Sequence, residues 1–230
     1  MASSGELISK LATLWALPEN AVGYPYRVLR ENGVTTKGGR GRSAARVTAR
    51  DAASLMIAVV CNARAKDIFD VWKAYGSLTA RDSRYTRRID SRSFDGGTSS
   101  PRWHLQGCEV AALQSLPEEH CFLDGLTALI AAFSDGSLPK ALRTIADDSD
   151  NNSYTFASVD VDVYGPLPSA RIEIKTNGFS ESITYRDALF TESGEDPCDW
   201  STRIEKLGAL MDHSTFTAST LEPIGNLIAE

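Results

Sequence analysis

A change of hydrophobic period to two, between residues 158 and 186, constrains the fold of this chain more than any other feature. Valines at positions 159, 161 and 163 alternate with aspartates, and apolar residues at positions 170, 172 and 174 alternate with charged ones. Successive side chains of a strand point to opposite faces, so both stretches predict strands with one buried face. Asn177-Gly178 favours a tight turn into a third strand, Phe179 to Arg186. The region predicts a three-stranded antiparallel meander with helices on its apolar face.

The first turn of this meander sets which side chains face each other. If residues 165–168 close the first hairpin, the two apolar rows meet on the buried face and Asp162 faces Arg171 on the other. Asp160 then faces Glu173. Like charges in opposite positions are unfavourable unless a cation lies between them.

The first 33 residues predict three short helices. Residues 5–17 place five apolar side chains on one helical face: Leu7, Ile8, Leu11, Leu14 and Trp15. Pro18 suits the first turn of a second helix, and Pro25 opens a third, from Tyr26 to Asn32. Gly33 then occupies the position of a C-terminal cap.

Two β-prone segments follow, Val34 to Thr36 and Ala45 to Thr48, and a basic glycine-rich segment, residues 37–43, separates them. This order predicts a β-hairpin with a cationic tip. Thr48 and Asp51 have the spacing of a capping box, which predicts a helix over about 49–65. The helical pattern continues or restarts over residues 68–76.

The elements over residues 5–65 resemble those of the winged helix-turn-helix family. Residues 27–34 (RVLRENGV), Arg40-Gly41-Arg42 and residues 46–53 (RVTARDAA) resemble the recognition helix, wing and post-wing helix of MerR-like regulators and phage excisionases. The resemblance implies DNA binding. The candidate DNA contacts are Tyr26, Arg27, Arg30, Lys37, Arg40, Arg42 and Arg46.

The chemistry of these residues fits DNA independently of the family. An exposed helix carrying Arg27 and Arg30 can enter a major groove, where arginine reads guanine edges. A glycine-rich tip lets Arg40 or Arg42 approach phosphates closely.

Charge is divided unevenly along the chain. Residues 1–104 carry a formal net charge of +8 and residues 105–230 one of −14, within a total of −6. Such asymmetry suggests a basic half that meets a polyanion and an acidic half with another role. The alternative is that the two halves attract each other.

The expected fold class is α+β, in three parts. Residues 1–76 form the winged helix-turn-helix, and residues 77–102, with six arginines among Ser and Gly, form a linker or long basic loop. Residues 103–230 form an acidic α+β dimerisation or partner domain built on the meander. Its helices are expected within 103–146, with a buried one over 120–133, and at about 203–212 and 220–229.

One alternative function is enzymatic. Asp160 and Asp162 on one strand and Glu173-x-Lys175 on its partner resemble the core of PD-(D/E)xK nucleases, in which the acids hold Mg²⁺. An amphipathic hairpin also produces this pattern, so the favoured interpretation of these residues is a solvated sheet face. A further alternative is an anti-defence factor whose acidic face occupies a DNA-binding groove on a host protein.

Other candidate sites are weaker. His104-x3-Cys108 and His120-Cys121 have zinc-ligand residue types, but a cysteine that begins an apolar run favours burial. Asp212-His213-Ser214 does not make a catalytic triad.

The sequence therefore predicts a cytoplasmic, sequence-specific DNA-binding regulator of the kind that phages and mobile elements encode. Its expected partners are double-stranded DNA, a second copy of the chain in a homodimer, and a protein partner through the acidic half. We expect no membrane association, no metal and no cofactor, and a binding role rather than catalysis.

Overall fold

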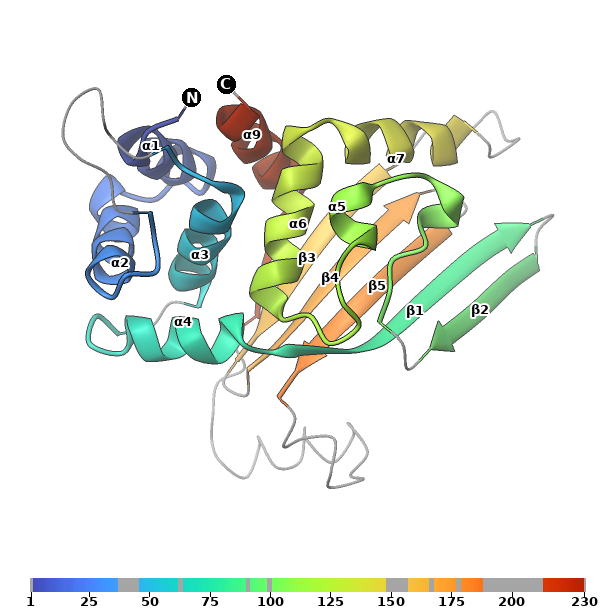
Figure 1. Ribbon diagram of the computed structural model, residues 1–230, viewed down its shortest axis with the longest axis horizontal. Coiled ribbons are helices and arrows are strands. Elements are labelled where there is room, and N and C mark those ends of the chain that lie inside the picture. The colour runs from blue at the N-terminus through green and yellow to red at the C-terminus, as the bar shows by residue number, and fades with distance from the viewer. Residues whose placement is uncertain are drawn as a thin grey trace.

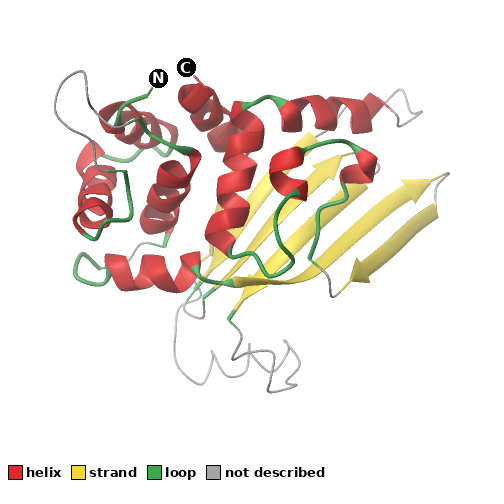
Figure 2. Cartoon of the chain, viewed as in Figure 1, coloured by secondary structure: helices red, strands yellow, loops and turns green. Residues whose placement is uncertain are grey.

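A six-stranded antiparallel sheet forms one layer of the molecule, and helices cover one of its faces (Figures 1 and 2). The computed structural model describes residues 2–36, 46–61, 64–89, 92–98, 101–147, 157–165, 168–176, 179–187 and 213–229. The strand order is β2-β1-β5-β4-β3-β6, so the meander lies in the centre of the sheet. The mixed α and β architecture confirms the expected α+β class.

Two helices, rather than three, form the first 33 residues. α1 (Ser4–Leu14) begins with a capping box at Ser3 and buries Leu7 and Leu11. α2 (Glu19–Glu31) is continuous through Pro25 and joins the two helices expected around that residue. Proline removes one helical hydrogen bond. Burial of Pro25 and of residues 22, 26 and 29 on the same side offsets that loss by packing α2 against its neighbours.

The predicted capping box at Thr48 is confirmed. It begins α3 (Ala49–Val60), in which the Asp51 carboxylate accepts a hydrogen bond from the Thr48 amide at 2.9 Å. The same carboxylate accepts one from the Thr36 amide, also at 2.9 Å, and so ties the first part of the α2–α3 connection to the start of α3.

The wing strands expected beside this connection are not present in the described residues. Residues 34–36 and 46–48 are irregular, and their backbone is held by contacts outside any sheet, such as the Val47 amide to the Ala2 carbonyl at 3.1 Å. The tip, with Lys37, Arg40 and Arg42, lies outside the described residues.

The helical pattern restarts as α4 (Ile68–Gly76), and the expected linker after it is instead a β-hairpin. β1 (Thr79–Ile89) pairs with β2 (Arg92–Thr98) on one side and with β5 on the other. The interpretation of residues 77–102 as a loop was wrong because the pairing with β5 joins segments about 100 residues apart. The composition of residues 77–102 contains no information about a pairing strand that lies so far away in the sequence.

The predicted register of the meander is confirmed. β3 (Ala157–Tyr164), β4 (Ser169–Thr176) and β5 (Phe179–Arg186) pair consecutively, with Val161 opposite Ile172 and Asp162 opposite Arg171. The sheet extends beyond the expected three strands, because β1 adds to β5 and β6 (His213–Thr217) adds to β3.

Five further helical segments in the described part of the chain belong to the helical layer. They are η2 (Leu105–Gly107), α5 (Ala111–Gln114), α6 (Phe122–Ser134), α7 (Ser137–Asp147) and α9 (Ala218–Ala229). α6 is the buried helix expected over residues 120–133, and it contacts α3, α9 and β4. α9 agrees with the helix expected near 220–229, whereas residues 203–212 lie outside the described part.

One buried apolar cluster extends from Leu7 in α1 to Ile224 in α9 and includes the inner face of the sheet. The expected boundary between residues 76 and 103 therefore does not separate two cores. Glu181 lies on this inner face and is 1% exposed. Its carboxylate accepts hydrogen bonds from the amides of His104 and Leu105, both at 2.8 Å, and so holds the start of η2 against the sheet. Among the described residues, no helix is long and apolar enough to cross a lipid bilayer.

The close approach of α9 to α6 generates a stability prediction. A Cβ added at Gly225 would lie 2.7 Å from Phe133 Cβ and 2.9 Å from the Ser134 amide nitrogen. Because one of these neighbours is backbone, α9 must shift, and we expect Gly225→Ala to lower the free energy of unfolding by about 1–3 kcal/mol. Urea denaturation measures this change.

The matched control is Gly5→Ala in α1. Its added Cβ would meet nothing closer than Ser3 Oγ at 3.9 Å. Alanine loses less conformational entropy than glycine in a helix, so this variant is expected to be stabilised by up to about 1 kcal/mol. Equal effects of the two substitutions would contradict the close packing of α9 on α6.

Candidate functional site

The face of the sheet opposite the helices is polar across its central strands. Side chains on this face lie in rows, because each register pair places its members side by side. One row contains Arg84, Ser182, Glu173 and Asp160, and the next contains Asp82, Thr184, Arg171 and Asp162. We refer to this surface as the open face.

Asp160 and Glu173, the like-charged pair predicted on the open face, share a basic neighbour, Lys175. Glu173, whose side chain is 7% exposed, lies opposite Asp160. Lys175 Nζ lies 2.9 Å from a Glu173 carboxylate oxygen and 3.8 Å from one of Asp160. Arg171 contacts the other Glu173 oxygen at 3.0 Å. Two basic side chains therefore compensate the buried carboxylate.

The Asp162 carboxylate contacts residues of β6 rather than the side chain of Arg171. Although it lies opposite Arg171 in register, its Oδ1 accepts a hydrogen bond from Thr215 Oγ1 at 2.7 Å and lies 3.1 Å from His213 Nε2. The His213 ring stacks on Tyr164 at 4.7 Å between centroids. These contacts link β3 to β6 and use the carboxylate that the nuclease interpretation assigns to a metal.

Within the part of the chain that the structure describes, no group of three or more His, Cys, Asp or Glu residues could hold a metal ion. Asp160, Asp162, Glu173 and Lys175 do share one face, as predicted. Their arrangement is that of acids neutralised by neighbouring cations and hydrogen-bond donors. It favours the interpretation as a sheet face over the nuclease interpretation.

A double-mutant cycle tests this interpretation. Lys175→Met leaves a buried Glu173 carboxylate with one cation fewer, whereas Glu173→Gln with Lys175→Met removes both charges. We expect the double variant to be more stable than the sum of the single changes predicts, by about 0.5–3 kcal/mol. Additive effects, with Mg²⁺-dependent plasmid nicking that both single variants lose, would support the nuclease instead.

His120, one of the weak zinc candidates, belongs to the core. It is 2% exposed, with Nδ1 2.7 Å from the Pro117 carbonyl and Nε2 2.9 Å from the Tyr185 hydroxyl. These distances fit a neutral ring in which Nδ1–H donates and Nε2 accepts. Cys121 Sγ donates to Asp124 Oδ2 at 3.0 Å. His104 is exposed, and its backbone amide is the group that binds Glu181.

The burial of His120 predicts a dependence of stability on pH. Burial lowers the pKa of His120 below the ordinary value of 6.5, and the Pro117 contact and the Asp124 charge oppose that shift only in part. In the unfolded chain His120 takes up a proton near pH 6.5, whereas in the folded chain it does so only at lower pH. The free energy of unfolding therefore decreases as pH falls through that interval. Urea unfolding between pH 7.5 and 5 should therefore show a steeper loss for the wild type than for His120→Gln, which keeps a neutral donor and acceptor. Parallel pH profiles would mean that His120 is not held neutral.

The candidate DNA contacts divide into three groups. Tyr26 was predicted to be exposed, but it is 8% exposed and packs in the core, because it lies on the side of α2 that also buries Val22 and Leu29. Arg27, Arg30 and Arg46 are exposed. Lys37, Arg40 and Arg42 lie outside the described residues.

The exposed side of α2 has its own contacts. The Arg27 guanidinium lies 5.2 Å from the centre of the Tyr24 ring, and its Nε is 3.6 Å from Glu31 Oε1. Tyr24 is 39% exposed and was not among the predicted contacts. Arg30 forms no ion pair with any described residue.

Sequence reasoning also missed a group of arginines on the open face. Arg84, Arg171 and Arg186 come from β1, β4 and β5 and line one pocket. Arg84 falls within residues 77–102, the segment that the sequence predicts as a linker or basic loop. The β-prone residues Tyr85 and Thr86 beside it are the signal that could have identified a strand.

Comparison with protein-family models, with curated proteins and with solved structures finds no match to this chain.

Proposed function

We propose that this protein is a sequence-specific DNA-binding regulator that contacts double-stranded DNA through α2 and the segment between α2 and α3. The observation that carries the proposal is the exposed side of α2, where Arg27 and Arg30 lie one turn apart and no described element covers them. A major groove admits a helix, and arginine is the side chain that most often reads bases there.

The packing of α2 is suited to a helix that contacts DNA bases. Val22, Tyr26 and Leu29 anchor its inner side in the core, so its outer side has a defined orientation. α1 precedes it after a short connection, residues 15–18, as in a helix-turn-helix. The Tyr24 ring and Glu31 restrict the Arg27 guanidinium. Arg30, without an ion pair among the described residues, keeps its donors available.

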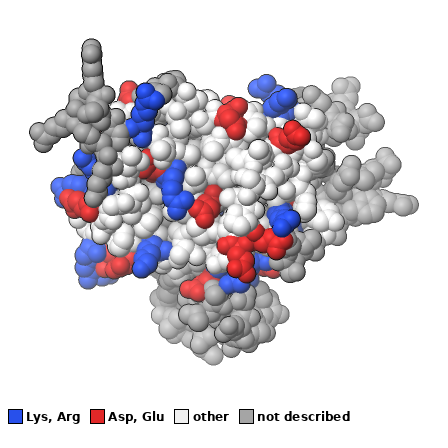
Figure 3. All heavy atoms as spheres, in the orientation of Figure 1, with Lys and Arg blue, Asp and Glu red and all other residues white. Residues whose placement is uncertain are grey.

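Charge supports the same surface. Residues 1–76 carry eleven Lys or Arg and six Asp or Glu, a formal net charge of +5. Basic side chains lie over α1–α4 with acids among them (Figure 3). The segment between α2 and α3 contributes Lys37, Arg40 and Arg42 to this total. Phosphate contacts from such residues give affinity that falls as salt rises, through counterion release.

The proposal predicts two kinds of arginine. Arg27→Ala and Arg30→Ala should each weaken binding to a selected DNA site by about 1–3 kcal/mol and relax base preference, because they remove base contacts. Arg40→Ala and Arg42→Ala should weaken all sequences alike and reduce the salt dependence, because they remove phosphate contacts. Site selection from a random oligonucleotide pool, followed by fluorescence anisotropy at several salt concentrations, measures both effects.

Arg143→Ala is the matched control, since Arg143 is exposed on α7 and carries the same charge. It should leave affinity and base preference unchanged. Loss of base preference from Arg40→Ala but not from Arg30→Ala would show that α2 is not the reading element. Absence of salt-dependent DNA binding by the full chain would refute the proposal as a whole.

A further inference from the structure

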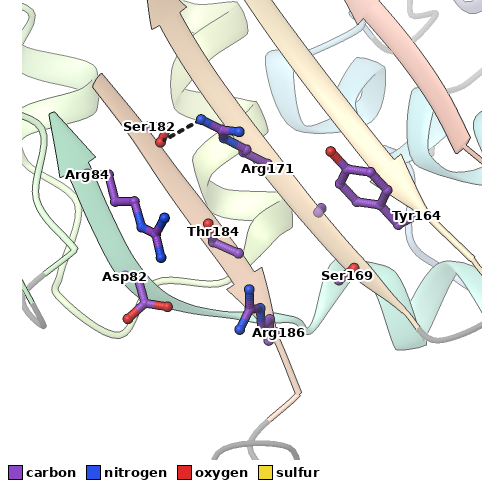
Figure 4. A pocket seen from close by; sticks show the side chains of 9 residues that line it. Asp82, Arg84, Tyr164, Ser169, Arg171, Ser182, Thr184 and Arg186 are labelled. Atoms are coloured by element: carbon purple, nitrogen blue, oxygen red, sulfur yellow. Dashed lines mark hydrogen bonds between the residues drawn. The ribbon is translucent and has the colours of Figure 1, made fainter. Parts of the chain in front are cut away.

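We propose that the pocket on the open face between β1, β5 and β4 binds the phosphate group of an anionic ligand. The pocket has a volume of about 260 Å³. Its lining is mainly polar: Asp82, Arg84, Tyr164, Ser169, Ala170, Arg171, Ser182, Thr184 and Arg186 (Figure 4). This inference does not depend on DNA binding by α2.

The register of the sheet brings the three arginines around Thr184. On β4, Arg171 lies directly opposite Thr184 of β5. Arg186 follows Thr184 by two residues on β5, so the two side chains point to the same face. On β1, Asp82 lies opposite Thr184, and Arg84 occupies the next position on that face, opposite Ser182. The three guanidinium groups thus border one small area from three strands.

Of the three arginines that line the pocket, only Arg171 has an acidic partner among the described residues. Arg171 contacts Glu173 at 3.0 Å and donates to Ser182 Oγ at 3.3 Å. Neither Arg84 nor Arg186 forms an ion pair with any residue in the described part of the chain. Asp82 is the one acid that lines the pocket, so the lining residues carry a net charge of +2. Like charges that line one pocket repel one another, and an anion bound there would offset that repulsion.

The concentration of cations here contrasts with the surrounding sequence. Residues 105–230 contain seven Lys or Arg against 21 Asp or Glu. Three of those seven, Arg171, Lys175 and Arg186, lie on the open face of β4 and β5. Arg171 and Lys175 compensate Glu173, whereas Arg186 has no ion pair with a described residue and adds an uncompensated charge to this face.

Phosphate fits this lining better than a monovalent anion does. Planar guanidinium groups bind phosphate oxygens through paired hydrogen bonds, and a tetrahedral group can accept from several directions at once. Ser182 and Thr184 add hydroxyl groups between the arginines. Burial and the nearby Asp162 charge raise the pKa of Tyr164, so its hydroxyl remains protonated at neutral pH. The volume suits one phosphate group, with the remainder of the ligand extending from the open side.

Titration calorimetry of the full chain with inorganic phosphate and with pyrophosphate tests the proposal, with sodium chloride at matched ionic strength as reference. We expect saturable binding by the wild type. Arg84→Gln with Arg186→Gln should weaken it at least about tenfold, since two charge-assisted contacts are lost. These two residues are chosen because neither compensates the buried Glu173.

The matched control is Arg64→Gln with Arg143→Gln, which removes the same charge from exposed positions away from the pocket. Thermal melts in chloride verify that both double variants are folded. Phosphate binding that is no stronger than the chloride reference, or that both double variants weaken equally, would overturn the proposal.

A second measurement identifies the source of the phosphate. If the pocket holds a backbone phosphate of nucleic acid, Arg84→Gln with Arg186→Gln also weakens oligonucleotide binding. If it holds a free phosphorylated molecule, oligonucleotide affinity is unchanged and only the phosphate and pyrophosphate titrations respond. Either result supports the phosphate site. Loss of phosphate binding through Arg27→Ala and Arg30→Ala, with the pocket variant unaffected, would assign the anion to α2 and contradict it.

Discussion

The register between β3, β4 and β5 is the constraint on which the rest of the structure depends. It places Val161 against Ile172 beneath α6 and, by the same alternation, places Glu173 beside Asp160 on the other face. Because the side-chain period of a strand is two, a slip of one residue would exchange the two faces. It would expose the apolar row and bury a row of charges without partners. The core and the open face are therefore specified together.

The charges on the open face show how a polar sheet surface is stabilised without a metal-binding cluster among the described residues. Glu173 is nearly buried and has two cations, Lys175 and Arg171, whereas Asp162 binds the β6 hydroxyl of Thr215 and the ring of His213. Removing one member of such a set leaves another uncompensated, which is why these residues have a structural explanation. Of the arginines around Thr184, Arg171 pairs with Glu173, whereas Arg84 and Arg186 form no ion pair with a described residue. This difference separates a candidate ligand site from a neutralised surface.

The two proposed sites use different supports. α2 is held from within by Val22, Tyr26 and Leu29, so its outer side has a defined orientation while its residues remain accessible. The pocket is held by backbone pairing of three strands, which places Arg84, Arg171 and Arg186 along one lining. One site would recognise a groove and the other a single anionic group.

The sequence by itself determined what depends on neighbouring residues. The alternation around Ile172 predicted the meander and its register, the Thr48 and Asp51 spacing predicted the start of α3, and the apolar run over 120–133 predicted α6. Tertiary structure decided what depends on distant partners. Burial of Tyr26 and the continuity of α2 through Pro25 follow from packing in the core, and pairing with β5 makes an arginine-rich segment into β1. Arg84 and Arg186 line one pocket only because strands about 100 residues apart pair, and such pairing leaves no periodic signal in the sequence.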